Sequence, residues 1–456
     1  MRTKGRPRDY LRAGFRFPHR RCQIGHLVRA SNPWVGPKNV FTWAAPSIEV
    51  GVGALAEIGW DVAQLGMTRI LIITDREVAA TGSADDVRSL LEAAGLEVEI
   101  YDQVGVEPTD ESIEQAVSFA DGGGWDGLVA IGGGPAIDTA KAVNLLVTHS
   151  GTLRYSIAPP IGDRRVPDRP LLPLVAVPTT AGTGSEATTI CVIDLLGHRL
   201  KAGISATQLR PTMAVIDPLT TMTLGPEISA ACGVDVLSHA IESYTAKAYN
   251  ARIAFESPAR RAAFCGANPI SDLWCERSIE LVERHLRRVV MNGSDLEARS
   301  RIMLASTYAD IGFGNAGTHL PHANASRVAG KVRSCRAAGY PEMPMVPHGQ
   351  AVAATAAPSF RFTYPACRER HLRAASLLTR HQVDPDLGAD ALPSVLNDLF
   401  CDIGIPRGIA AFGFTDDDIP ELVAGTLEQQ RQLAVVPRPV TPVALARVVK
   451  DWLAGS

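Results

Sequence analysis

The segment Gly127-Leu-Val-Ala-Ile-Gly-Gly-Gly-Pro-Ala-Ile-Asp-Thr-Ala-Lys141 decides the fold of this chain. Residues 127–131 predict a short apolar strand, and the three glycines that follow allow a tight turn into a helix. The start of such a helix offers free N–H groups and the positive end of its dipole to a pyrophosphate. The alternative is a plain strand-to-helix turn, which does not need three glycines followed by an acid and a lysine. The candidate cofactor-binding residues are Gly132, Gly133, Gly134 and Asp138.

Strands and helices alternate on both sides of this segment, from about residue 46 to 220. β-Branched and apolar runs predict strands, and 3.6-residue periodicity predicts helices between them. The predicted strands cover 69–74, 96–101, 127–131, 174–177 and 214–217, and the predicted helices cover 83–94 and 110–121. This alternation predicts a mainly parallel, doubly wound sheet.

The second half of the chain has a different pattern. From Pro226 onward strand signals fade, and helical periodicity covers 278–290, 296–309 and 443–453. A chain of 456 residues is also too long for one ordinary hydrophobic core. We therefore predict an α/β nucleotide-binding domain over 38–221 and an all-α domain over 222–456, after an extension of residues 1–37.

Composition excludes several functions. The net charge of -3 gives no general attraction to nucleic acid or to an anionic membrane. No apolar run approaches the roughly 18 residues that span a bilayer. The eight cysteines form no C-x-x-C pair, which argues against a thiolate zinc site or a disulfide framework and fits a reducing cytoplasm. Neither nucleic acid nor a membrane is therefore expected as a partner.

Residues 1–37 contain nine Arg or Lys and one acid, Asp9. A mitochondrial transit segment is basic and acid-poor in the same way. Four prolines interrupt any long amphipathic helix, however, and there is no apolar signal core. We favour a disordered extension and a cytoplasmic location; a transit peptide would instead place the chain in the mitochondrial matrix.

A second glycine-rich segment, Pro178-Thr-Thr-Ala-Gly-Thr-Gly-Ser-Glu186, also follows a predicted strand. Small hydroxyl residues supply donors without bulk, as a phosphate or ribose requires. Two such segments after two parallel strands predict a nucleotide crevice. Asp75 ends another predicted strand, where its carboxylate would accept from a ribose 2′-OH and repel a 2′-phosphate. This favours NAD over NADP, and the alternative for Asp75 is a helix N-cap.

Aspartate and histidine residues suggest a metal centre. Asp235 and His239 stand four apart in a predicted helix and so share one face. Downstream lie His319, His322 and His348, and three histidines with one aspartate suit Fe²⁺ or Zn²⁺. Spacing alone does not choose between His319 and His322, and a lone histidine is more often structural than a ligand.

Four separate motifs resemble the iron-containing alcohol dehydrogenase family. They are Gly132-Gly-Gly-x-x-x-Asp138-x-x-Lys141, Pro178-Thr-Thr-Ala-Gly-Thr-Gly-Ser-Glu186, Gly233-x-Asp235-x-x-x-His239-Ala-x-Glu242 and Pro347-His348-Gly349. Their order and spacing also match, from about residue 39 onward. Within the family the closer likeness is to the hydroxyacid–oxoacid transhydrogenases, in residues 106–110, 266–272, 295–300, 311–317 and 424–427.

The resemblance implies a Rossmann-like α/β domain with a parallel sheet, an all-α C-terminal domain of the dehydroquinate synthase-like type, and a cleft between them. It also implies that the metal ligands are Asp235, His239, His322 and His348. His319 becomes a near neighbour and a candidate catalytic residue. Further cofactor contacts are implied at Gly133, Gly134, Thr179, Thr180, Thr183 and Lys201. A homodimer is expected from the same resemblance.

The chain departs from the family pattern at three places. Pro135 replaces a serine after the glycines and removes one hydroxyl and one N–H donor. Ala323-Asn324 stands where the family usually has Gly-Met, and Ser326 replaces a histidine that many relatives carry. A proton relay through that histidine is therefore not expected here, although the ligands themselves are intact.

The resemblance further implies hydride transfer through bound NAD(H), with a metal acting as a Lewis acid on the substrate hydroxyl. The implied substrates are 4-hydroxybutyrate and 2-oxoglutarate, and the implied products are succinate semialdehyde and 2-hydroxyglutarate. Because both substrates are carboxylates, an arginine is expected near the site. The candidates are Arg260, Arg261 and Arg327, each of which could equally be a surface charge.

Three other functions remain as alternatives. The nearest is an ordinary NAD-dependent alcohol dehydrogenase that exchanges its cofactor with solution, since the motifs do not separate the two. A metal- and NAD-using lyase of the dehydroquinate synthase type would need more lysines and histidines around a phosphate-bearing substrate. A non-catalytic binding protein is the least favoured, because four ligands lie beside a nucleotide crevice.

Overall fold

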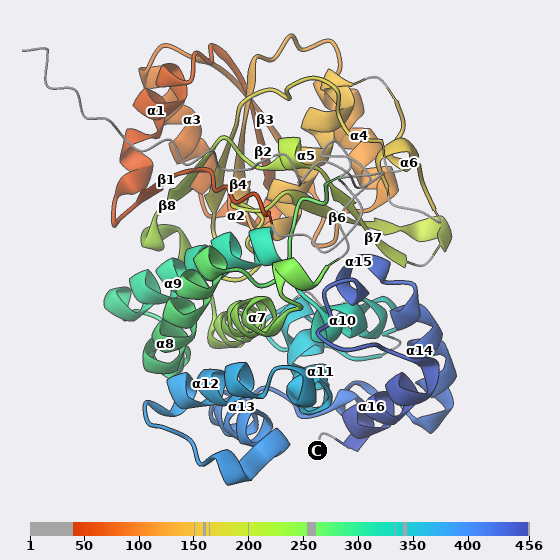
Figure 1. Ribbon diagram of the computed structural model, residues 1–456. Coiled ribbons are helices and arrows are strands. Elements are labelled where there is room, and N and C mark those ends of the chain that lie inside the picture. Colours follow the sequence, from red (N-terminus) through yellow and green to blue (C-terminus); the bar gives the residue numbers. More distant parts are fainter. Residues whose placement is uncertain are drawn as a thin grey trace, which may run out of the picture.

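The computed structural model describes residues 40–149, 151–157, 161–163, 165–198, 200–252, 261–332, 334–340 and 344–454. The basic extension 1–37 and Arg260 lie outside the described residues, so the structure does not test the predictions made for them. Two regions follow one another along the chain, an α/β region and a helical region (Figure 1).

A six-stranded sheet forms the centre of the α/β region, with the strand order β1-β8-β5-β4-β2-β3 and every pairing parallel. The strands are β1 (Ser47–Val50), β2 (Arg69–Asp75), β3 (Glu97–Val104), β4 (Gly127–Gly132), β5 (Leu174–Pro178) and β8 (Met213–Ile216). The five predicted strands and the parallel sheet are confirmed. Strand β1 was not predicted, because four residues with two apolar side chains are too short a run to identify.

Helices cover both faces of the sheet, as the alternation of side chains along each strand requires. Ile70 and Ile72 of β2 pack with helices α1 (Ile58–Gln64) and α3 (Ser83–Ala93). Leu71 and Ile73 point to the other face and pack with helices α4 (Asp110–Ala120) and α5 (Gly134–Thr148). The doubly wound arrangement is therefore confirmed, and helix α2 (Arg76–Ala80) connects β2 to α3.

An antiparallel hairpin of β6 (Ile190–Leu195) and β7 (Leu200–Ser205) extends from the sheet domain. One face of the hairpin, including Cys191, Ile193, Ala202 and Ile204, is buried in a core shared with α4 and α5. The opposite face carries Val192, Asp194, Lys201 and Gly203. The sequence did not predict this hairpin, because its strands are short and carry polar residues on one face.

The helical region begins after β8 and packs around its first helix (Figure 1). Its helices are α7 (Pro226–Thr245), α8 (Pro269–Met291), α9 (Leu296–Ala316), α10 (Leu320–Gly330), α11 (His348–Thr363), α12 (Arg368–Thr379), α13 (Ala391–Asp402), α14 (Ile419–Leu427), α15 (Gln430–Leu433) and α16 (Pro442–Ala454). The three predicted helical segments lie in α8, α9 and α16. The boundary placed between residues 221 and 222 stays a prediction.

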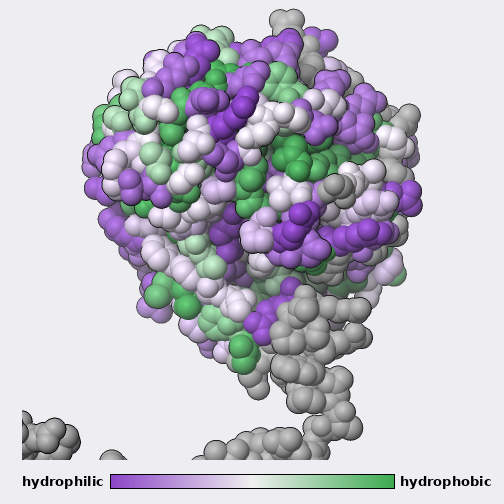
Figure 2. All heavy atoms as spheres, turned by 90° about the horizontal axis from the view of Figure 1, so that it is seen from above, coloured by the Kyte–Doolittle hydropathy of each residue, from purple (hydrophilic) through white to green (hydrophobic). Residues whose placement is uncertain are grey.

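Short elements complete the chain. They are α6 (Leu153–Ser156) and the 3₁₀ turns η2 (Ala54–Glu57), η3 (Leu196–His198), η4 (Thr207–Leu209), η5 (Pro218–Thr221), η6 (Tyr249–Ala251), η8 (Tyr364–Ala366), η9 (Pro385–Asp390), η10 (Ile409–Phe412) and η11 (Asp416–Asp418). On the face of the molecule in Figure 2, hydrophilic side chains are interspersed with small apolar groups. No helix among the described residues is long and apolar enough to cross a bilayer.

Replacing Gly59 with alanine is expected to destabilise the protein. A Cβ at Gly59 would lie 2.5 Å from the carbonyl oxygen of Leu90, so α1 would have to move away from α3. Overpacking of this kind costs about 1–3 kcal/mol, and we expect the free energy of unfolding in urea to fall by that amount. Gly330→Ala is the matched control, because a Cβ at this exposed position meets no atom within 4 Å. Equal losses in both variants would contradict the packing of α1 on α3.

Candidate metal centre and nucleotide site

The candidate metal centre is built on α7, a helix that is buried over most of its length. Asp235 and His239 lie one turn apart on this helix and are 2% and 3% exposed. His322 comes from the first turn of α10, and His348 is the first residue of α11. Three helices that are far apart in sequence therefore bring the four predicted ligands to one place.

The four side chains converge on one carboxylate oxygen, Oδ1 of Asp235. The Nε2 atoms of His322, His239 and His348 lie 3.4, 3.9 and 4.0 Å from it, respectively. Ligand atoms of Asp235, His239 and His322 all lie within 4.8 Å of one another. His348 is more open, with 41% of its side chain exposed, and it marks the side on which a small molecule can approach.

Unpaired polar atoms show that this set suits a cation. Oδ1 of Asp235 and Nε2 of His322 are buried and have no hydrogen-bond partner among the described residues. Burial of unpaired polar atoms is costly, and a divalent ion would satisfy both. One carboxylate with three imidazoles is also a donor set that first-row divalent metals accept. The residues present therefore fit a metal ion.

The electrostatics of the centre point the same way. Burial raises the pKa of Asp235, but the neighbouring imidazoles of His239, His348 and His322 outweigh it and hold that pKa well below its usual value. Burial lowers the pKa of His239 to about 3, which keeps its imidazole neutral and able to bind a metal. Burial also lowers the pKa of His322, yet the Glu242 and Asp235 carboxylates raise it to about 9. A metal would therefore take the place of a proton on His322.

Glu242 orients His322. Its Oε1 lies 2.6 Å from Nδ1 of His322, and its Oε2 accepts from the backbone N–H of His319 at 2.6 Å and of His322 at 3.5 Å. Because the carboxylate accepts a hydrogen bond from Nδ1–H of His322, the other ring nitrogen, Nε2, is directed at Asp235. The sequence motif includes Glu242, but its role was not predicted, because only the folded structure brings α7 and α10 together.

His319 lies outside the group of ligands. Its Nδ1 accepts from the backbone N–H of Leu320 at 2.7 Å, and its Nε2 lies 2.9 Å from Oγ1 of Thr245. Thr245 donates its own hydrogen to the carbonyl of Ile241, so its oxygen accepts from His319. Both ring nitrogens are therefore engaged, and a catalytic role for His319 stays a prediction that this geometry does not favour.

Two stacked rings fix the plane of His239. Its ring stacks on Phe313 at 3.9 Å between centroids and on His322 at 4.6 Å. Nδ1 of His239 lies 4.0 Å from Oδ1 of Asp310, a fully buried residue. Burial and the neighbouring carboxyl of Glu186 raise the pKa of Asp310 well above its usual value. The two carboxyl groups, Asp310 and Glu186, therefore retain a proton between them. The sequence analysis did not identify Asp310.

The two glycine-rich segments meet at the carboxyl edge of the sheet. The backbone N–H of Thr179 donates to the carbonyl of Gly132 at 3.0 Å. A Cβ on Gly134 would lie 2.8 Å from the side chain of Thr183, and one on Gly133 would lie 3.6 Å from that of Thr180. Glycine is therefore needed where the segments approach most closely, and the start of α5 faces the threonines. Together they form the candidate phosphate cradle.

The remaining predicted cofactor residues differ in their surroundings. Asp75 is the N-cap of α2, where Oδ1 accepts from the N–H of Val78 at 2.8 Å. Its other oxygen would lie 3.2 Å from a Cβ on Gly132, so it faces the cradle. Asp138 is buried: its Oδ2 accepts from the N–H of Val192 at 2.8 Å, which ties α5 to the hairpin, and its Oδ1 lies 3.8 Å from Nζ of Lys141. Its role as a cofactor contact stays a prediction.

Lys201 lies on β7 and forms ion pairs with Glu107 and, at 3.5 Å, with Asp194. Its strand contacts α10, the helix that carries His322. The hairpin therefore extends from the nucleotide side of the site toward the metal side.

Replacing Glu242 with glutamine is expected to weaken metal binding about 10- to 100-fold, because outer-sphere partners of a ligating histidine have effects of this size. Glutamine has one acceptor oxygen where the carboxylate accepts from three N–H groups. Competition between the protein and a chelator for Zn²⁺ measures the affinity. Glu227→Gln, at an exposed position on the same helix, is the control. Unchanged affinity in the Glu242 variant would contradict its role.

Comparison with known proteins agrees with this geometry. The sequence model described as iron-containing alcohol dehydrogenase matches residues 45–218, and the model of the C-terminal region of that family matches residues 263–451. The chain is 41% identical over 406 residues to "Hydroxyacid-oxoacid transhydrogenase, mitochondrial" of Bos taurus, covering 88% of this chain and 87% of that protein. It is also 41% identical over 405 residues to the Xenopus laevis protein of the same name, covering 87% of each.

Solved structures share the fold as well. A crystal structure of 1,3-propanediol oxidoreductase superposes with a TM-score of 0.79 and 28% identity, covering 91% of this chain and all of that one. The residues that the two family sequence models match include both glycine-rich segments and the helices that carry His322 and His348. The chain belongs to the iron-containing alcohol dehydrogenase family of oxidoreductases that act on CH–OH groups.

Proposed function

We propose that this chain is a hydroxyacid–oxoacid transhydrogenase. The observation that carries the proposal is a centre of one aspartate and three histidines beside a phosphate cradle, in a chain about 40% identical to proteins of that name over most of its length. In the proposed reaction 4-hydroxybutyrate is oxidised to succinate semialdehyde, while 2-oxoglutarate is reduced to 2-hydroxyglutarate. One hydride and one proton pass from the first substrate to the second, so no reducing equivalent is left over.

The proposed metal is Fe²⁺, with Zn²⁺ as the alternative, held by Asp235, His239, His322 and His348. When bound, it would supply Lewis-acid stabilisation of charge on the substrate oxygen. The protein's part is to hold the ligands still: Glu242 fixes the tautomer of His322, and Phe313 fixes the ring plane of His239. The exposed side of His348 leaves room for the substrate.

The proposed cofactor is NAD(H), which would carry the hydride between the two substrates. The start of α5 at Gly133 and Gly134 would bind the pyrophosphate, with Thr180 and Thr183 as hydroxyl donors. Pro135 follows at the second position of α5, where its missing N–H removes no intrahelical bond. Lys201 would lie toward the nicotinamide end, since its strand β7 contacts the helix that carries His322.

The second candidate is an ordinary NAD-dependent alcohol dehydrogenase. It is favoured by the likeness to a 1,3-propanediol oxidoreductase, which has the same fold and 28% identity. The two functions need the same residues and differ in how fast NADH leaves the protein. A measurement that withholds free cofactor therefore separates them.

The compartment and the assembly of the chain stay predictions. The two transhydrogenases compared above are named mitochondrial, and residues 1–37 of this chain are basic. The expected homodimer is tested by the mass of the purified particle in solution.

The central experiment withholds free NAD. Protein purified anaerobically with Fe²⁺ is mixed with 4-hydroxybutyrate and 2-oxoglutarate, and the products are followed by mass spectrometry. We expect 2-hydroxyglutarate to form, and Asp235→Asn to abolish it by removing the charged ligand. Turnover only after NAD is added would replace the proposal with the ordinary dehydrogenase. No turnover in either condition would refute both substrates.

Replacing Asp75 with serine is expected to lower the preference for NADH over NADPH about tenfold, the size of one charge-assisted hydrogen bond. Serine keeps the N-cap that Asp75 provides to α2 and removes only the charge. The two dissociation constants are measured by nucleotide fluorescence. Glu77→Gln, two residues further on and exposed, is the control. If the Asp75 variant prefers NADH over NADPH as strongly as the parent protein does, the carboxylate acts only as a helix cap.

A further inference from the structure

A guanidinium group without a counter-charge lies against the outer face of the hairpin. Arg431 is on α15, and its Nε would be 3.9 Å from a Cβ on Gly203 of β7. Lys201 lies two residues before Gly203, and side chains two apart on a strand share one face. Arg431 therefore approaches the same face of β7 that carries Lys201, and Figure 1 shows α15 directly beside the hairpin.

Several other partly or fully buried arginines have partners, unlike Arg431. Arg370 pairs with Asp272, Arg299 donates to two backbone carbonyls, and Arg210 donates to the carbonyl of Ala187. The guanidinium of Arg431 has no hydrogen bond or ion pair with any residue in the described part of the chain. Burial lowers its pKa to about 10, which still leaves it charged at neutral pH. Its side chain is only partly buried and none of its nitrogens is among the buried unpaired atoms, so water reaches the guanidinium and an anion from solution can reach it as well.

The position of Arg431 connects it to the metal centre. Helix α10, which carries His322, contacts both β7 and α15. Arg431 therefore lies where the hairpin and α15 meet the helix that carries a proposed metal ligand. Gly203 matters as well, because any side chain there would occupy the space beside the guanidinium.

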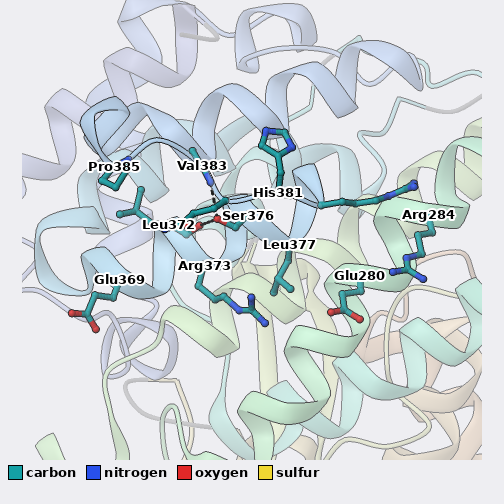
Figure 3. A pocket seen from close by; sticks show the side chains of 12 residues that line it. Glu280, Arg284, Glu369, Leu372, Arg373, Ser376, Leu377, His381, Val383 and Pro385 are labelled. Carbon is teal, nitrogen blue, oxygen red and sulfur yellow. Dashed lines mark hydrogen bonds between the residues drawn. The ribbon is translucent and has the colours of Figure 1, made fainter.

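The arginines expected from the sequence are placed differently. Arg327 pairs with Glu428 and packs against Gly425, so its charge is already neutralised. Arg261 is partly buried with no partner among the described residues, and it serves as the direct rival. The open pocket shown in Figure 3 is lined by Arg284 and Arg373, but none of its residues belongs to the candidate site.

We propose that Arg431 binds the carboxylate of the hydroxyacid and oxoacid substrates, in the space that Gly203 leaves open. This inference takes its substrate class from the proposed function. A guanidinium presents two parallel N–H donors to a carboxylate and so fixes its direction as well as its charge. Binding one end of the substrate in this way positions the hydroxyl or carbonyl carbon at the other end. Arg431 is therefore a specificity-determining residue for acids over neutral alcohols.

The test uses the Fe²⁺-loaded protein and compares 4-hydroxybutyrate with 1,4-butanediol, a neutral alcohol of equal length. In Arg431→Met we expect the ratio of kcat/KM for the acid to kcat/KM for the diol to fall about 100-fold, as for loss of a charge-assisted hydrogen bond. In Arg431→Lys part of the lost preference for the acid should be recovered. Gly203→Leu should lower the same ratio with the guanidinium retained, because its side chain blocks the space. A ratio unchanged in Arg431→Met, or lowered by Arg261→Met instead, would overturn the assignment.

A binding measurement separates this inference from the proposed reaction. Calorimetry with glutarate, an unreactive dicarboxylate, is expected to show binding to the parent protein and none to Arg431→Met. If the parent protein does not exchange hydride between 4-hydroxybutyrate and 2-oxoglutarate, but glutarate binding depends on Arg431, the proposed reaction fails and the carboxylate site stands. If glutarate binds equally to both proteins, or to neither, the carboxylate site fails whatever the reaction is.

Discussion

The hydrogen bond between Glu242 and His322 is the interaction on which the metal centre depends. A buried carboxylate with no partner would be too costly for a helical core, and Glu242 avoids this cost by accepting from two backbone N–H groups and one imidazole. The same bonds anchor the first turn of α10 to α7. A single side chain thus sets both the packing of two helices and the direction of Nε2 of His322, so the stability of this region and its ability to bind a metal are coupled.

Close helix packing around α7 imposes a second constraint. Gly349, next to His348, lies so near the backbone carbonyl of Ala231 that a Cβ there would clash with it. Gly233 is similarly pressed against Leu286 of α8. These contacts bring α8 and α11 close to the helix that carries Asp235 and His239. The imidazole of His348 reaches Asp235 because its neighbour has no side chain, which gives the Pro347-His348-Gly349 motif a physical reason.

Local patterns sufficed to predict the parallel sheet and its covering helices, because each strand is a continuous apolar run followed by a turn or a helix start. The hairpin β6–β7 was missed, since half of its side chains face outward and its apolar pattern is short. The ligand set needed the family resemblance, as spacing could not separate His319 from His322. Sequence did not assign the roles of Glu242, Asp310 and Arg431, because each depends on a contact between elements far apart in the chain.

The second glycine-rich segment packs on α7, and this contact would hold the proposed cofactor and the substrate at a fixed separation. Gly182, in the second glycine-rich segment, would place a Cβ 3.0 Å from the Cβ of Cys232, three residues before Asp235 on α7. The segment expected to hold the nucleotide therefore packs directly on the helix that holds the metal ligands. Effective hydride transfer requires near-contact of the reacting carbons, and an ångström of misplacement is costly. In this fold that separation is set by backbone packing at Gly182, where a larger residue would force the cradle and the metal centre apart.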